Sequence, residues 1–159
     1  MKTIACLSAL LLTLSACQTV DNTAAGNASI AHINPPEMID TSAMGYSHIV
    51  TAKGGKLMFI AGQGPTKKSE KKAKDLRGQT RQAVDNILTA LAAAGAGPEN
   101  ILYLRINVVG YNPRMMLDIA PELARLKGEN MPPPASVFIG VESLILPTTM
   151  IEIETIAAL

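Results

Sequence analysis

The C-terminal stretch MIEIETIA has a clear alternation of apolar and polar positions. One side of an expected strand would carry Ile151, Ile153 and Thr155. The other side would carry Glu152 and Glu154, because successive side chains of a strand point to opposite faces. From the pattern alone, the two carboxylates could be a solvated edge, a structural ion pair, or the acid–base groups of a site.

The rest of the chain alternates between strand-like and helix-like periods. Two short apolar runs flank the Gly-Gly pair within Lys53–Lys56, which is typical of a β-hairpin. From Asp75 onward, apolar residues recur at helical spacing, which predicts a helix. Gly95 is a signal for the end of this helix. Strands are expected to follow at 101–111 and 136–144.

A second helix is expected from Arg114 to about Lys127, with Pro121 kinking or splitting it. The resulting order, two strands, a helix, a strand, a helix and two strands, predicts an α+β sandwich with both helices on one sheet face. Because the strands remain apolar on both faces, we expect the uncovered face to pack against other copies of the chain.

The N-terminal residues predict targeting to the cell envelope. Lys2 precedes an apolar run over 4–14, and Leu-Ser-Ala-Cys ends at Cys17. This pattern is typical of a secretory signal and resembles the lipobox of bacterial lipoproteins, although an ordinary signal with a chance cysteine is the alternative. We expect a signal peptide at 1–16, lipid on Cys17, a flexible tether at 17–34 and one domain at 35–159. Gln18 favours a periplasm-facing lipoprotein of the outer membrane.

Charge and composition narrow the function classes. Without Lys2, 13 basic residues stand against 13 acidic ones, a balance that does not suggest a nucleic-acid-binding protein. Cys6 falls inside the expected signal, so the mature chain would contain no disulfide and no cysteine nucleophile. With only two histidines, we expect no metal site.

An ordered set of segments from Tyr46 to the C-terminus resembles the Rid family, also called YjgF-like. The matching segments are LMFIAGQGP, QTRQAVDNILTALAAAGAGPENILYLRINVVGYNP, PPPASVFIGVESL and IEIETIA. The resemblance implies a chorismate-mutase-like sandwich with a mixed β-sheet and two helices on one face. It also implies a homotrimer with small-molecule sites in the clefts between subunits. Characterised members hydrolyse enamines and imines to 2-oxo acids and ammonia, using water and no cofactor.

The resemblance also assigns residues. Glu152 occupies the catalytic position that handles water. The expected ligand-binding residues are Tyr46, Gly62, Gln63, Asp118, Ser136 and Phe138. Asp118 stands where many members have asparagine, and Phe138 where several have cysteine.

The chain departs from the deaminases at Ser136. Those enzymes have an arginine there, which holds the substrate carboxylate. Charged hydrogen bonds contribute about 1.5–3 kcal/mol each. A serine in place of the arginine would therefore weaken the binding of an anionic imine by roughly 3 kcal/mol. Two functions therefore remain open: an envelope hydrolase acting on imines, enamines or related carbonyl compounds, and a trimer that binds a small ligand or a protein without catalysis.

Overall fold

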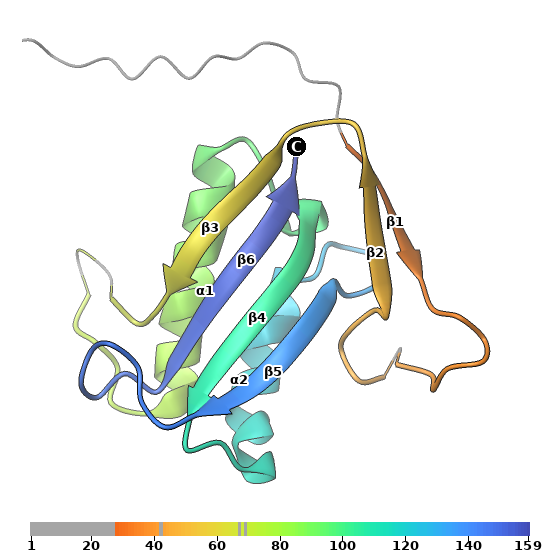
Figure 1. The fold of residues 1–159 in the computed structure, drawn as a ribbon. Coiled ribbons are helices and arrows are strands. Elements are labelled where there is room, and N and C mark those ends of the chain that lie inside the picture. Colours follow the sequence, from red (N-terminus) through yellow and green to blue (C-terminus); the bar gives the residue numbers. More distant parts are fainter. Residues whose placement is uncertain (1–27, 42, 67, 69) are drawn as a thin grey trace, which may run out of the picture.

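A four-stranded mixed sheet forms the centre of the computed structural model, which describes residues 28–41, 43–66, 68 and 70–159. Across the sheet the order is β3 (Leu57–Gln63), β6 (Ile151–Ala158), β4 (Ile101–Val109) and β5 (Ala135–Val141). Strand β6 is antiparallel to both neighbours, whereas β4 and β5 are parallel. A separate antiparallel pair consists of β1 (Ser29–Ile33) and β2 (Ile49–Lys53) (Figure 1).

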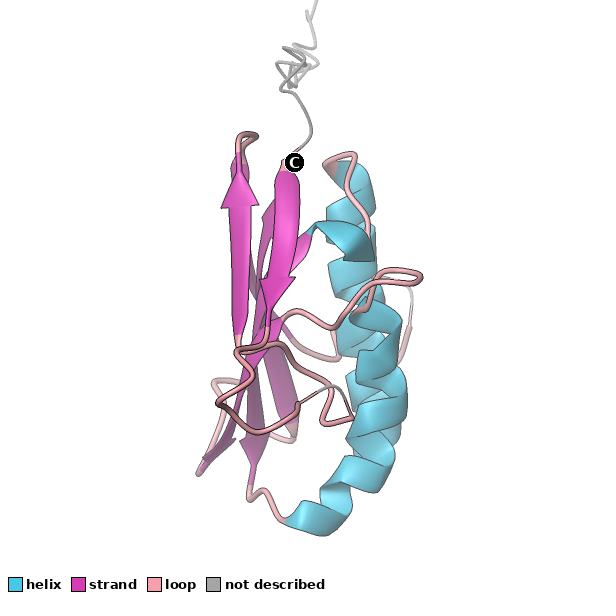
Figure 2. Ribbon diagram, turned by 90° about the vertical axis from the view of Figure 1, so that its right-hand side faces the viewer, coloured by secondary structure: helices cyan, strands magenta, loops and turns pink. Residues whose placement is uncertain are grey.

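Both helices cover the same face of this sheet (Figure 2). They are α1 (Leu76–Ala93) and α2 (Met116–Leu123). Three 3₁₀ turns accompany them: η1 (Pro98–Asn100), η2 (Pro113–Met115) and η3 (Ala124–Leu126). The expected α+β sandwich, with a mixed sheet and two helices on one face, is confirmed.

Local sequence signals fix both ends of α1. Asp75 caps the first turn, where its carboxylate accepts a hydrogen bond from the Gly78 N–H at 2.8 Å. At the other end Gly95 adopts a φ of +76°, and the N–H groups of Gly95 and Ala96 donate to the carbonyls of Ala92 and Leu91. This is a Schellman motif, which needs a left-handed residue and therefore favours glycine.

Pro121 lies inside α2, where it cannot donate the usual hydrogen bond to the carbonyl of Leu117. Arg77 of α1 donates to that carbonyl instead, at 2.8 Å. The helical segment around α2 is divided, because η2 precedes it and η3 follows it. Helix α2 continues through Pro121, so the proline does not split it there, and the 3₁₀ turn η3 begins three residues later.

The predicted β-hairpin at Lys53–Lys56 is wrong. Gly54 and Gly55 make a turn with φ values of +78° and +73°, but β2 and β3 enter different sheets. Backbone hydrogen bonds between Lys56 and Leu159, at 3.2 and 3.0 Å, extend the pairing of β3 with β6. Strand β2 pairs with β1 instead, because the segment before Pro35 supplies a second partner.

That partner corrects the expected tether at 17–34, whose last residues form β1. The expected signal peptide and Cys17 lie outside the described residues. Within the part of the chain that the structure describes, neither helix has the length and apolar character needed to cross a bilayer.

The hydrophobic core fills the space between the sheet and the two helices. Its fully buried members include Ile87 and Leu91 of α1, Ile119 of α2, and Ile151 and Ile153 of β6. The alternation predicted for the closing strand is confirmed, because Thr155 is also buried on this side. Among the residues that the structure describes, no helix lies over the opposite, open face of the sheet (Figure 2).

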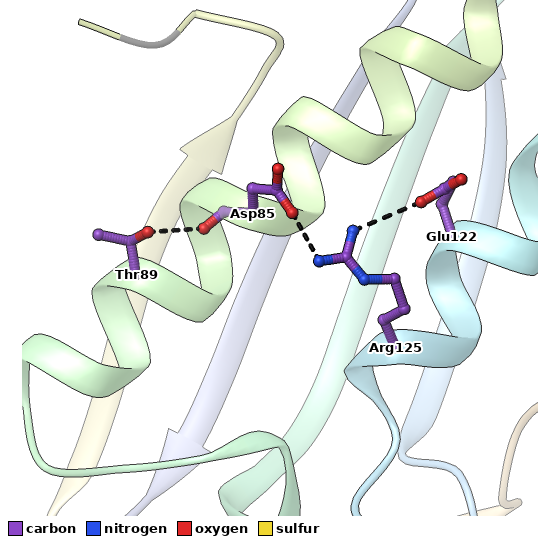
Figure 3. Close-up of polar contacts among 4 residues, drawn as sticks. All are labelled: Asp85, Thr89, Glu122 and Arg125. Carbon is purple, nitrogen blue, oxygen red and sulfur yellow. Dashed lines mark hydrogen bonds and ion pairs between the residues drawn. The ribbon is translucent and has the colours of Figure 1, made fainter. Parts of the chain in front are cut away.

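An ion-pair cluster joins α1 to the turn after α2 (Figure 3). Arg125 Nη2 lies 2.6 Å from Asp85 Oδ1, and Arg125 Nη1 lies 3.4 Å from Glu122 Oε2. The hydrogen bond to Asp85 is the main cause of the raised pKa of Arg125. The guanidinium therefore remains charged at any pH at which the protein would be assayed.

Candidate functional site

Glu152 is placed on the open sheet face by the alternation of β6. It lies opposite Asn107 of β4, while Glu154 lies opposite Arg105 one pair further along. Glu152 is partly buried, whereas Glu154 is exposed. The two carboxylates predicted to share a face therefore have different environments.

Gly62 of β3 is the close neighbour of the Glu152 side chain. A Cβ added at Gly62 would lie 2.7 Å from both Cδ and Oε1 of Glu152. The carboxylate therefore occupies the space that any other residue at position 62 would fill. The ladder between β3 and β6 shifts register between Ile60 and Gln63, and such irregularities bend a strand and redirect its side chains.

A pocket opens beside this carboxylate, and we call it the Glu152 pocket. Its volume is about 260 Å³. Its lining residues are Gly62, Gln63, Gly64, Pro65, Thr66, Asn86, Leu144, Ile145, Leu146, Thr149 and Glu152. The loops that follow β3 and precede β6 form its walls and lie together at the lower left of Figure 1.

Polar side chains of α1 hold these loops in place. Asn86 donates to the carbonyls of Gly64 and Thr66, both at 3.0 Å. Buried Gln79 donates to the Thr148 carbonyl at 2.9 Å and accepts from the Met150 N–H at 2.8 Å. The two bonds hold the chain at Thr148 and Met150, and Thr148 has a φ of +63°, which is unusual for a β-branched residue. Such strain persists only where the surroundings enforce it.

A second cavity lies on the helix-covered side of the sheet, between α2 and β5, and we call it the α2–β5 cavity. Its volume is about 240 Å³. Its lining residues are Ala43, Met44, Gly45, Leu104, Ile106, Met116, Ala120, Leu123, Ala124, Lys127, Pro133, Pro134 and Ser136. Ser136 lies here because it pairs with Leu104, whose side chain faces the core.

The segment with Tyr46 is anchored beside this cavity. The Ser47 hydroxyl donates to the Pro133 carbonyl at 2.6 Å, and the Ser47 N–H donates to the Pro134 carbonyl at 3.1 Å. Tyr46 itself makes an edge-on contact with His48, with ring centroids 5.7 Å apart. The segment that carries Tyr46 is thereby held against the loop that leads to Ser136.

The predicted site residues therefore fall into separate places within one chain. Glu152, Gly62 and Gln63 meet in the Glu152 pocket, whereas Ser136 lines the α2–β5 cavity. The other three, Tyr46, Asp118 and Phe138, lie in neither lining. Phe138 packs on Tyr111, with centroids 4.9 Å apart, and Asp118 pairs with Arg77 at 3.4 Å.

Sequence reasoning missed several residues that shape these sites. Gln79 and Asn86 were detectable in principle, because each is a polar residue near the inner side of an amphipathic helix, where it needs partners. Lys127 had no such signal, since a lysine at the end of a helix is usually solvated. Among the described residues, no three His, Cys, Asp or Glu side chains gather closely enough to hold a metal ion.

Comparison with known proteins identifies the family to which the chain belongs. The family model described as Endoribonuclease L-PSP matches residues 38–159. The comparison with curated proteins gives no match.

Solved structures match over most of the chain. The Rid-family protein YyfB of Yersinia pestis is 36% identical over 82% of this chain and 98% of its own, with a TM-score of 0.76. A YjgF-type family member from Mycobacterium tuberculosis is 27% identical over 82% of this chain and all of its own, with a TM-score of 0.55. TdcF of E. coli, solved with bound serine, is 20% identical over 66% of this chain and 82% of its own, with a TM-score of 0.56; at that identity the likeness concerns the fold alone.

Proposed function

The chain belongs to the Rid family, and from this premise we propose that it binds a small imine or enamine and hydrolyses it with Glu152 as the group that handles water. The observation that carries the proposal is the position of the Glu152 carboxylate, directly over Gly62 and at the wall of a pocket. The description of the family model names RNA cleavage, but 14 basic and 13 acidic residues do not favour a nucleic-acid ligand.

The proposed reaction needs one group that moves a proton and no cofactor. Water adds to the carbon of a protonated imine, and Glu152 accepts the proton that the water loses. Glu152 then returns this proton to the nitrogen of the resulting carbinolamine and the C–N bond breaks. The hydroxyl proton passes to the released ammonia, which leaves a carbonyl group and ammonium. The position of Glu152 in the pocket lining supports this role, because a general base must lie within hydrogen-bond reach of the water that it deprotonates.

The proposal includes a homotrimer with its ligand clefts between copies. Two observations support it. Three apolar residues on the open sheet face are solvent-exposed: Leu57 (62% exposed), Phe59 (73%) and Val137 (37%). Exposed apolar patches often mark interfaces. The Glu152 pocket and the α2–β5 cavity also lie apart within one chain, one beside the edge strand β3 and the other beside the edge strand β5, so that a second copy could complete each of them.

A second candidate function, binding without catalysis, is favoured by the α2–β5 cavity. Ser136 brings one neutral hydroxyl to this cavity, where the deaminases have an arginine. A trimer of this kind would retain the cleft and bind a small ligand without hydrolysing it. The two candidates differ in turnover but share the site.

The envelope location also belongs to the proposal, and it rests on the signal-like residues 1–16 and on Cys17. Mass spectrometry of the mature protein tests it. A chain that begins at Cys17 and carries acyl groups supports the lipid anchor, whereas an unprocessed N-terminus contradicts it.

The catalytic proposal is tested by generating 2-iminobutanoate in situ with a pyridoxal-dependent dehydratase and following its loss. The wild-type chain should accelerate the loss, and Glu152→Gln should reduce the rate by about 10²–10⁴-fold, the usual contribution of acid–base catalysis. Glu154→Gln is the matched control, because Glu154 lies on the same strand face but is exposed, and it should retain the rate within about twofold.

The results separate the two candidates. Saturable binding without acceleration by the wild-type chain would reject the hydrolase and favour the binder. Ser136→Arg then asks whether the missing guanidinium is the cause. A variant that gains turnover would show that the remaining machinery is intact.

A further inference from the structure

The Glu152 pocket contains a carboxylate that has no partner in the chain. Among the lining residues of the pocket, all of which the structure describes, Glu152 is the only charged one. Within the described residues, its side chain forms no hydrogen bond and no ion pair. A ligand that covers this carboxylate removes it from water, which is costly unless the ligand brings a positive charge.

The lysines of the surrounding segments do not supply that charge to the pocket lining. Lys72 donates to the Pro147 carbonyl at 3.0 Å and to Thr149 Oγ1 at 2.8 Å, so its ammonium is engaged by the loop before β6 and is not a lining group. Lys68 is exposed and lines a neighbouring open groove. Lys127 belongs to the α2–β5 cavity. An anionic ligand would therefore meet the carboxylate of the pocket with no cation in the lining beside it.

The rest of the wall combines a hydrogen-bond acceptor with an apolar surface. Asn86 donates both N–H groups of its amide to the Gly64 and Thr66 carbonyls, so its Oδ1 remains as an acceptor. The consecutive apolar residues 144–146 form another part of the wall. The volume of about 260 Å³ limits the ligand to a small one, because pockets for drug-sized ligands measure roughly 300–1,000 Å³. These features favour a compact cation with a short aliphatic body.

We propose that the Glu152 pocket binds a small alkyl iminium ion that carries no carboxylate, with its N–H group on Glu152 and its alkyl groups against residues 144–146. The proposal deepens the proposed function and rests on it, since it names the substrate class as imines derived from simple aliphatic amines. One oxygen of Glu152 can accept from the iminium N–H while the other takes the proton of the attacking water, because a carboxylate accepts several hydrogen bonds. A 2-imino acid would instead bring a second carboxylate toward Glu152, and like charges placed side by side disfavour binding.

Three stable probes with the same butyl frame test the preference for a cation. Isothermal titration calorimetry on the full chain would compare sec-butylammonium, butan-2-ol and 2-methylbutanoate, which are cationic, neutral and anionic. The cation should bind about tenfold or more tightly than the alcohol, and the anion should bind more weakly than the alcohol. Glu152→Gln should abolish the preference for the cation and leave binding of the alcohol unchanged. Glu154→Gln and Lys68→Met, which remove exposed charges outside the lining, should leave all three affinities as in the wild type.

The imine assay then compares two substrates of similar shape. A flavin-dependent amine oxidase generates butan-2-imine from sec-butylamine, and an amino-acid oxidase generates 2-iminobutanoate from 2-aminobutanoate. Relative to the uncatalysed loss of each imine, the wild-type chain should favour butan-2-imine by about tenfold or more in kcat/KM. Ile145 lines the pocket and is 89% exposed, so Ile145→Lys adds a cation that the fold tolerates. This variant should shift the preference toward 2-iminobutanoate, whereas Ile145→Gln should not.

Two binding results would overturn the proposal: equal affinity of the wild-type chain for sec-butylammonium and butan-2-ol, or a preference for the cation that persists in Glu152→Gln. The imine assay separates this proposal from the proposed function. A wild-type preference for 2-iminobutanoate would reject the substrate class and keep the hydrolase. Glu152-dependent binding of the cation without acceleration of either imine would reject catalysis and keep the cation site.

Discussion

At the scale of single residues, the contact between Gly62 and Glu152 is the most sensitive point of the proposed site. A methyl group at position 62 would overlap the carboxylate, with distances of 2.7 Å to Cδ and Oε1. Gly62→Ala should therefore push the end of a flexible side chain aside while the backbone stays in place. We expect hydrolysis to fall by about 10- to 100-fold, because catalysis is lost when a group is misplaced by about 1 Å. The free energy of unfolding should change by less than about 1 kcal/mol.

Gly64→Ala is the control for that substitution, measured by the same imine assay and by urea denaturation. A Cβ at Gly64 would lie 3.7 Å from its nearest neighbours, which is ordinary contact. Because Gly64 lines the same pocket without crowding Glu152, the substitution should leave the stability near wild type and lower the rate less than Gly62→Ala does. Equal rates in the two variants would show that the position of Glu152 does not limit the reaction.

Part of this site could be predicted from the sequence. Glu152 followed from strand alternation and family resemblance, and Gly62 and Gln63 followed from the same resemblance; the structure brings all three to one pocket. Lys127 could not be predicted. Its place at a cavity wall depends on how the end of the helical segment around α2 lies relative to β5, and no local pattern encodes that arrangement.

At the scale of elements, signals that act within one element were more reliable than signals for pairing. The helix start at Asp75, the Gly95 stop and the alternation of β6 each depend on neighbouring residues, and all three are seen. The hairpin predicted at Lys53–Lys56 is wrong because its glycines specify a turn but do not specify which strands pair. The alternation of β4 also breaks near its start. Ile101 is 2% exposed, and a register shift between Ile101 and Tyr103 interrupts the period of two.

The contact between α1 and η3 gives a prediction at this scale. A double-mutant cycle with Asp85→Asn and Arg125→Met should give a coupling energy of about 0.5–1 kcal/mol in urea denaturation, because the Arg125 side chain is 40% exposed and solvent screens the pair. The cycle for Arg77 and Asp118, which are 53% and 50% exposed and 3.4 Å apart, is the control and should give coupling near zero. Coupling that is larger in the control pair would contradict the role of the Arg125 cluster in docking η3 on α1.

At the scale of the whole molecule, the sheet has one face that no helix of the described residues covers. Helices α1 and α2 lie on the other side (Figure 2). The open face carries exposed Leu57 and Phe59 on β3 beside the carboxylates of β6. The sequence predicted this arrangement, because its strands are apolar on both sides while the chain provides helices for one side only. The number of copies that would meet there in the proposed homotrimer depends on the shape of the whole surface, and no period along the chain encodes that shape.

Phe59→Glu tests whether the open face is the surface on which copies assemble. Phe59 is 73% exposed in one chain, so a charge there should be tolerated by the fold but should be costly inside an interface, where an unpaired carboxylate loses its hydration. Sedimentation velocity should show a trimer for the wild-type chain and dissociation to monomers for the variant, with unchanged circular dichroism.

Leu117→Glu provides the control, because Leu117 is 75% exposed but lies on α2, on the helix side. This variant should remain trimeric. If the wild-type chain sediments as a monomer, or if Leu117→Glu dissociates while Phe59→Glu does not, the ligand clefts cannot lie where the proposed function requires them. The two pockets would then have to act separately within one chain.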